Sequence, residues 1–171
     1  GYGTPVLIGR TEPTQDTIRQ SGLGEAAGLE SVNAANSPHT RQYHEMLYAK
    51  LQRRGSLLRD VIRMVNQDRN VFGACMVEAG HADAMVTGTT RSFAVCLEDV
   101  LRVIEVREHQ TLMAISVVVA RGRTVLIADT SVHELPTAEQ LADFASQSGS
   151  LAPQLGDETR GAFLSFSNFG N

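Results

Sequence analysis

Residues 111–128 read TLMAISVVVARGRTVLIA, two apolar runs with Arg121-Gly122-Arg123 between them. Both runs are rich in β-branched residues, a composition typical of buried strands. A gap of only three residues predicts that the runs pair as a hairpin. We therefore predict two central strands, Thr111–Ala120 and Thr124–Ala128.

Helical patterns and short apolar runs alternate on both sides of this hairpin. Apolar residues recur at helical spacing in four segments before it, and one helix is predicted after it. This alternation predicts an α/β fold, a layered open mixed sheet flanked by helices. The predicted helices cover residues 38–54, 57–65, 71–79, 93–104 and 137 toward 156, and the further strands cover residues 5–9, 31–34, 82–86 and 162–165.

Capping residues set the predicted ends of several helices. Ser37 before Pro38 predicts an N-cap with proline at the first helical position. Gly55 and Gly80 follow the last periodic residues of two helices, where glycine commonly ends a helix. The run Thr137-Ala138-Glu139-Gln140 has the form of a capping box and predicts a helix start.

Composition excludes several classes of protein. The 171 residues carry a net charge of −4, with 42% hydrophobic and 20% charged residues, values typical of a folded domain rather than a disordered chain. No apolar run is long enough to span a bilayer, and the acidity predicts no nucleic-acid partner. Cys75 and Cys96 lie in apolar helical patterns, which predicts reduced core thiols in a cytoplasmic protein. Because no Met opens the sequence, we expect a piece of a longer chain.

Two short motifs suggest cofactor sites but lack the required context. The run Gly22-Leu23-Gly24-Glu25-Ala26-Ala27 has the G-x-G-x-x-A pattern, yet no strand is predicted directly before it, so we interpret it as a helix stop and a loop. His44-Glu45 resembles part of a zinc-binding helix, but Tyr48 stands where the second histidine belongs. We therefore predict no metal site and no catalytic residue in this chain.

Small polar residues follow three of the predicted strands. In open α/β sheets ligands bind beyond the carboxyl ends of strands, so these clusters predict one cleft. Arg91 would add a charge near a helix N-terminus that favours anions. Alternatively, Thr89 or Thr90 only caps a helix and Gly88 only permits a turn, and the spacing leaves both interpretations open. The clusters are residues 87–91 (TGTTR), 129–131 (DTS) and 165–168 (SFSN).

Several segments, in this order, resemble motifs of the phosphate acetyl/butyryltransferases. They are residues 70–77 (NVFGACMV), 82–88 (ADAMVTG), 136–142 (PTAEQLA) and 163–167 (FLSFS). Within that family, residues 86–92 (VTGTTRS), 120–125 (ARGRTV) and 165–171 (SFSNFGN) most resemble the C-terminal phosphotransacetylase-like domain of bacterial NADP-dependent malic enzymes.

The resemblance implies a two-lobed domain, like that of isocitrate and isopropylmalate dehydrogenases, with a coenzyme A cleft between the lobes. Residues 1–171 would be its central part, with a lobe boundary near residues 88–110. The resemblance also implies a homo-oligomer that responds to acetyl-CoA, a small-molecule effector, with no membrane partner. Malate oxidation, NADP and a divalent metal would belong to an N-terminal region outside this sequence.

One departure from the family pattern concerns the anion site. Active phosphotransacetylases carry an Arg-Pro pair several residues after the Thr-Gly or Ser-Gly turn, and Glu98 and Asp99 stand there in this sequence. A carboxylate in place of a guanidinium repels acetyl phosphate, which favours a regulatory domain. An active phosphate acyltransferase and a purely structural oligomerisation module remain the alternatives. The predicted ligand site for acetyl-CoA or phosphate comprises Thr87, Gly88, Arg91, Asp129, Ser165 and Ser167.

Overall fold

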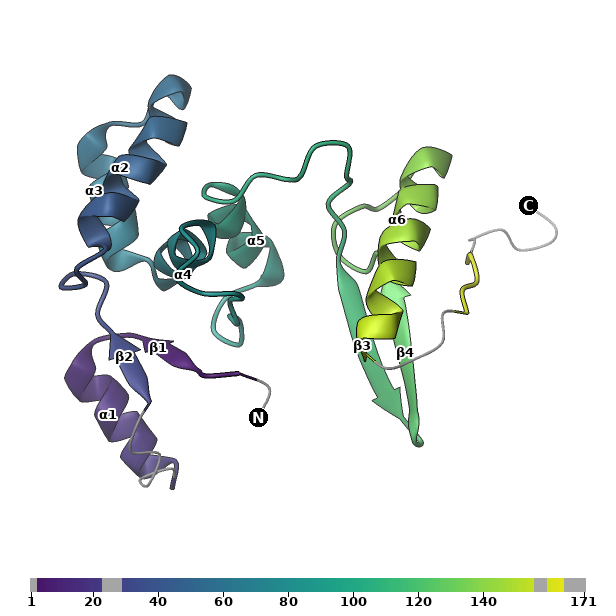
Figure 1. Ribbon diagram of the computed structural model, residues 1–171, viewed down its shortest axis with the longest axis horizontal. Helices are drawn as coiled ribbons and strands as arrows, with labels where there is room; N and C mark the ends of the chain where they lie inside the picture. The colour runs from purple at the N-terminus through teal and green to yellow at the C-terminus, as the bar shows by residue number, and fades with distance from the viewer. Residues whose placement is uncertain (1–2, 23–28, 156–159, 165–171) are drawn as a thin grey trace. The chain divides into compact units, whose positions relative to one another are not determined.

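The computed structural model describes residues 3–22, 29–155 and 160–164, and Figure 1 shows helices and short strands along the chain. The chain divides into two compact units, Gly1–Glu105 and Val106–Asn171. Six α-helices and two small sheets lie in the described residues, so the predicted α/β class is confirmed. The described strands form two separate two-stranded sheets. The predicted layered mixed sheet, and the two-lobed domain with a lobe boundary near residues 88–110, stay predictions.

The sheet of the first unit joins β1 (Val6–Ile8) and β2 (Glu30–Val32). The strands are parallel, with Val6 opposite Glu30, and helix α1 (Thr11–Gln20) lies between them in the sequence. Both strands were predicted, although β2 begins one residue earlier than expected. Helix α1, rather than a strand, precedes Gly22, which is not the context that a dinucleotide-binding turn requires, and residues 23–27 of that motif lie outside the described residues.

Four further α-helices complete the first unit. They are α2 (Thr40–Leu51), followed by the 3-10 helix η1 (Gln52–Arg54), α3 (Leu58–Gln67), α4 (Arg69–Glu78) and α5 (Phe93–Leu101). Gly55 and Gly80 have φ values of 86° and 74° and end their helices as predicted. The predicted N-cap position was wrong: α2 begins two residues after Pro38, with His39 at the N-cap and no side-chain cap. Ser37 Oγ instead accepts a 3.3 Å hydrogen bond from His39 N–H in the turn before the helix.

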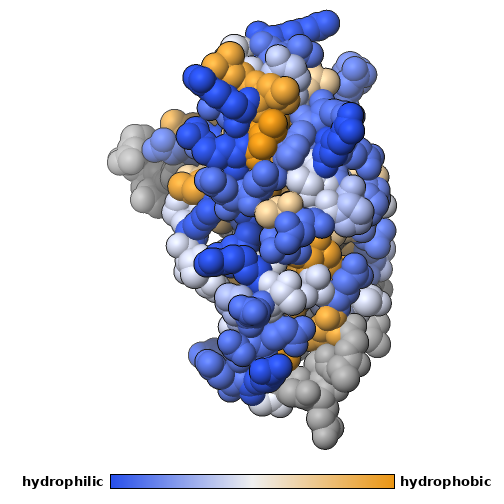
Figure 2. Space-filling view, turned by 90° about the vertical axis from the view of Figure 1, so that its left-hand side faces the viewer, coloured by the Kyte–Doolittle hydropathy of each residue, from blue (hydrophilic) through white to orange (hydrophobic). Residues whose placement is uncertain are grey.

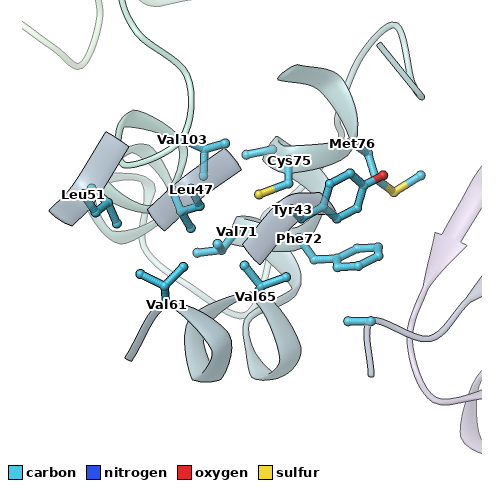
Figure 3. Packing of buried hydrophobic residues seen from close by; sticks show 12 residues of the cluster. Tyr43, Leu47, Leu51, Val61, Val65, Val71, Phe72, Cys75, Met76 and Val103 are labelled. Carbon is cyan, nitrogen blue, oxygen red and sulfur yellow. The ribbon is translucent and has the colours of Figure 1, made fainter. Parts of the chain in front are cut away.

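The core of the first unit lies between α2, α3 and α4 (Figure 3). α4 contributes to it on several sides, since seven of its ten residues are buried. Gly73 permits a close approach to the segment after α4, because a Cβ there would lie 2.7 Å from the Met85 sulfur. The fully buried large side chains are Tyr43, Leu47, Val61, Val65, Val71, Phe72, Cys75 and Val103.

The segment Ala82–Val86, predicted as a strand, forms no strand. A strand needs a partner for its backbone groups, and none of the four described strands pairs with this segment. Met85 anchors it on α4 through Gly73, while Val86 is 99% exposed. The predicted final strand is also not formed over its described residues 162–164.

The second unit consists of a hairpin and one long helix (Figure 1). β3 (Ile115–Ala120) and β4 (Arg123–Ala128) are antiparallel, with Ala120 opposite Arg123. The turn therefore contains two residues instead of three. The strands are not central as predicted, because they pair only with each other in the described residues and most of their side chains are exposed.

Helix α6 (Ala138–Leu151) follows the hairpin and continues into the 3-10 helix η2 (Ala152–Leu155). The predicted capping box is confirmed: Thr137 N–H donates to Gln140 Oε1 at 2.8 Å, and Gln140 N–H donates to Thr137 Oγ1 at 3.3 Å. Pro153 lies in η2, where the α-helical hydrogen bonds have ended.

The surface has polar and apolar regions. Figure 2 shows that the face at the left of Figure 1, over α1, α2 and α3, is largely hydrophilic with separate hydrophobic patches. None of the helices in the described residues is long and apolar enough to cross a membrane.

The two cysteines, Cys75 and Cys96, are buried free thiols, as predicted from their apolar helical surroundings.

Candidate functional site

A surface groove of about 610 Å³ lies in the first unit. One side comes from the segment that follows α4, and the other side comes from α5. Its wall is mainly apolar, and Arg91 is the one charged side chain among its described lining residues. The lining residues are Met85, Val86, Thr87, Gly88, Thr89, Arg91, Phe93, Cys96, Leu97 and Val100. The structure thus brings three of the predicted site residues together, namely Thr87, Gly88 and Arg91.

Arg91 is held at this groove by two carboxylates. Its Nη1 lies 2.6 Å from Asp68 Oδ2 and 2.9 Å from Asp99 Oδ2. The hydrogen bond to Asp68, with the charges of both acids, raises the pKa of Arg91. The guanidinium is therefore charged at any working pH, but its charge is already compensated.

Asp99 is the most buried acid of this network, with only 4% of its surface exposed. Its Oδ1 accepts a 3.0 Å hydrogen bond from Arg102, and its Oδ2 also accepts one of 3.1 Å from the Asn70 side chain. Arg102 in turn pairs with the exposed Glu98 at 2.6 Å. Two guanidinium groups thus face three carboxylates, and the network as a whole is negative.

Asn70 connects this network to the predicted ligand turn. The Thr87 hydroxyl donates a 2.6 Å hydrogen bond to Asn70 Oδ1, while Asn70 Nδ2 donates to Asp99. Asn70 is buried in the first turn of α4. A buried amide with both ends satisfied fixes the position of Thr87 on the rigid core of the unit.

The N-terminus of α5 also lies at the groove, but its cap differs from the expectation. The Ser92 hydroxyl accepts a hydrogen bond from Val95 N–H, so neither Thr89 nor Thr90 caps this helix. Gly88 has a φ of 140° and Thr89 a φ of 62°, and the turn thus needs the conformational freedom of glycine. The turn interpretation therefore holds for Gly88, and its role as a ligand site is untested.

Asp129 lies in the second unit and holds the turn that follows β4. Its carboxylate accepts backbone hydrogen bonds from Ala114 at 3.0 Å and His133 at 2.9 Å, and Nδ1 of His133 lies 2.6 Å from Oδ2. Burial opposes ionisation, yet these bonds outweigh it and lower the pKa of Asp129. Its place in a ligand cleft stays a prediction, and Ser165 and Ser167 lie outside the described residues.

Asp68 and Asn70 are functional-site residues that the sequence patterns did not predict. Asp68 caps α4, since its Oδ1 accepts hydrogen bonds from Asn70 N–H at 2.8 Å and Val71 N–H at 3.4 Å. An aspartate directly before a helical apolar pattern is a typical N-cap, and this signal was available. Its second role, as a partner of Arg91 across 23 residues of sequence, has no signal in the local pattern.

Comparison with known proteins gives a family and a fold. A relative is the NADP-dependent malic enzyme of Rhizobium meliloti (strain 1021), 46% identical over 99% of this chain and 22% of that enzyme. The phosphate acetyltransferase of Corynebacterium glutamicum is 34% identical over 80% of this chain and 41% of that protein. The chain thus spans about a fifth of the matched malic enzyme and less than half of the transferase.

A solved structure shows the same fold. The EutD phosphotransacetylase from Staphylococcus aureus superposes on 99% of this chain, with a TM-score of 0.73 and 22% identity, and the match covers 51% of that protein. The model of the family described as phosphate acetyl/butaryl transferase matches residues 1–171. The chain therefore belongs to the phosphate acetyl/butaryl transferase family.

Proposed function

We propose that this chain is the acetyl-CoA-responsive regulatory and oligomerisation domain of a cytoplasmic NADP-dependent malic enzyme. The similarity to the malic enzyme of Rhizobium meliloti over nearly the whole chain supports this assignment. The oxidative decarboxylation of malate to pyruvate, with NADP and a divalent metal, would take place in a region outside this sequence. The domain would sense acetyl-CoA and catalyse no reaction itself.

The observation that carries the proposal is the state of Arg91. An acyl transfer from acetyl phosphate needs a cation free to bind and stabilise the phosphate. Here Asp68 and Asp99 already engage the guanidinium within 3 Å. Catalysis of acyl transfer at this groove is therefore disfavoured, whereas binding of a thioester ligand is not.

The groove has the chemistry that a thioester arm of coenzyme A requires. Its wall is mainly apolar, with Phe93 and Leu97 on α5, and the polar residues Thr87 and Thr89 also line it. Ligand pockets are commonly apolar with a few polar groups that orient the ligand. An acetyl-pantetheine arm fits this description, since it combines methylene groups with amide and thioester carbonyls.

Titration of acetyl-CoA into the full-length protein tests the proposal. We expect saturable binding by calorimetry and inhibition of malate oxidation over the same concentration range. Phe93→Ala should weaken both, because Phe93 lines the groove and is 49% exposed. Leu58→Ala on α3 is the matched control, since Leu58 is 46% exposed and lies outside the groove. Equal effects of the two variants, or no binding, would refute the groove as the effector site.

The alternative function is an active phosphate acetyl- or butyryltransferase, which moves an acyl group between phosphate and coenzyme A. The similarity to the Corynebacterium glutamicum phosphate acetyltransferase favours it. Assay of acetyl-CoA formation from acetyl phosphate and CoA with the full-length protein distinguishes the two. Turnover of about 1–1000 per second would establish the transferase and exclude the regulatory proposal.

The oligomerisation role is supported by the hairpin of the second unit. Val118 lies opposite Val125 in the ladder, so both side chains are on one face, and they are 42% and 52% exposed. Adjacent exposed apolar residues of this kind mark a surface that associates. Sedimentation of the full-length protein should show an oligomer, and a stable monomer at high concentration would contradict this part of the proposal.

A further inference from the structure

The charge of the groove is controlled by residues that do not line it. Arg91 faces the groove, while Asp68 and Asp99, its two partners, are absent from the described lining. The ligand specificity of the groove therefore depends on what these two carboxylates do to Arg91.

Both carboxylates are held in place by contacts other than the one with Arg91. Asp68 is fixed as the N-cap of α4, through the backbone N–H groups of Asn70 and Val71. Asp99 is fixed by the Asn70 amide at 3.1 Å and by Arg102 at 3.0 Å. Because neither acid relies on Arg91 for its position, both stay beside the guanidinium when a ligand arrives.

A phosphate must therefore approach Arg91 in the presence of two fixed negative charges. Each carboxylate adds repulsion, and solvent screens the charge of Asp99 the less because that side chain is buried. An uncharged carbonyl meets no such repulsion. Both acids contact Nη1, and within the described residues Nε and Nη2 of Arg91 have no hydrogen-bond partner, so these groups are able to donate to a carbonyl oxygen.

We propose that Asp99, together with Asp68, determines the specificity of the groove, by neutralising Arg91 so that the groove rejects phosphate and accepts an uncharged amide or thioester carbonyl. Asp99 and Asp68 are specificity-determining residues that act through Arg91. The proposal rests on the proposed function only in taking this groove as the ligand site.

Inorganic phosphate is the probe that tests the proposal, with binding to the full-length protein followed by phosphorus NMR. We expect no saturable binding to the unaltered protein at millimolar phosphate. Asp68→Asn/Asp99→Asn should bind phosphate roughly tenfold more tightly or better, because two negative charges next to the cation are removed. Adding Arg91→Ala to that variant should abolish the gained binding. Asp16→Asn, which removes one charge from an exposed acid of α1, is the matched control for the single variant Asp68→Asn.

Asp68→Asn alone is the variant to use if the change at buried Asp99 impairs folding, as seen by circular dichroism. Asparagine is an equally good N-cap, so α4 keeps its start, and a smaller gain in phosphate affinity is expected. Binding of phosphate by the unaltered protein through Arg91 would overturn the proposal, and so would the absence of a gain in the folded variants. Acetyl-CoA titrations are a separate readout: their failure refutes the proposed effector and leaves the phosphate result standing.

Discussion

Arg91 and Asp99 form an ion pair in which Nη1 lies 2.9 Å from Oδ2, and the acid is almost fully buried while the guanidinium is partly exposed. Burial of a carboxylate is costly unless partners satisfy it. Asp99 has three such partners, Arg91, Arg102 and Asn70. The pair therefore links the stability of the first unit to the charge of its groove.

The first prediction concerns this buried acid. Asp99→Ala should lower the free energy of unfolding by about 1–3 kcal/mol, because it leaves the buried Asn70 amide without its acceptor and removes one of the two carboxylate partners of Arg91 and of Arg102. Glu98→Ala is the control, since the exposed Glu98–Arg102 pair should contribute less than about 1 kcal/mol. Urea unfolding followed by far-ultraviolet circular dichroism measures both. Similar losses for the two variants would contradict the structural role of Asp99.

The second prediction concerns the reactivity of Cys75. Burial raises the pKa of this thiol to about 12, against the opposing effect of the nearby Lys50. At pH 8 only about one thiol in ten thousand is then the reactive thiolate. In a Cys96→Ser variant, iodoacetamide should leave Cys75 unmodified in the native protein and label it in urea. Mass spectrometry provides the readout, and rapid labelling of the native form would show that the thiol is accessible and ionised.

The third prediction concerns the hairpin turn. Arg121 and Gly122 both have positive φ, 51° and 71°, as a two-residue hairpin turn requires. Arg121→Asn should stabilise the hairpin by about 0.5–1 kcal/mol, since asparagine tolerates this conformation better, and Gly122→Ala should destabilise it by about 1 kcal/mol. Amide hydrogen exchange in β3 and β4 measures both changes. Arg123→Asn, in the strand, should not produce the gain, and an equal gain there would exclude the turn as its cause.

The fourth prediction concerns pH. The pKa of Asp129 is lowered in the folded state, because hydrogen bonds from Ala114 and His133 outweigh the opposing effect of burial. The stability that ionised Asp129 gives the folded state should be complete above about pH 4, the ordinary pKa of an aspartate. It should disappear as the pH falls through the lower pKa of the folded state. Asp129→Asn should therefore lower the free energy of unfolding by about 1–3 kcal/mol at pH 7 and by less in acid.

Hydrogen exchange of the Ala114 and His133 amides reports on this unit directly, because both N–H groups donate to Asp129. Glu134→Gln serves as the control, since Glu134 is exposed and its loss should leave the two amides protected. Protection that is independent of pH in the unaltered protein would contradict the assigned role of Asp129.

The sequence by itself determined the features that depend on near neighbours in the chain. The capping box of Thr137 and Gln140 was predicted from a spacing of three residues, and Gly55 and Gly80 were predicted from the end of an apolar period. The paired runs around Arg121 and Gly122 likewise predicted β3 and β4. Each of these signals is local, since the interacting groups are separated by a few residues and their geometry follows from backbone conformation.

Only the tertiary structure decided the features that depend on distant residues. Val86 belongs to a β-like run, yet it forms no strand, because a strand requires a partner and the apolar pattern does not name one. Arg91 has the residue type of an anion site, yet folding places it beside Asp68, 23 residues away, and beside the buried Asp99. The charge of a site is the sum over groups that the fold brings together, and the local sequence around Arg91 contains only part of that sum.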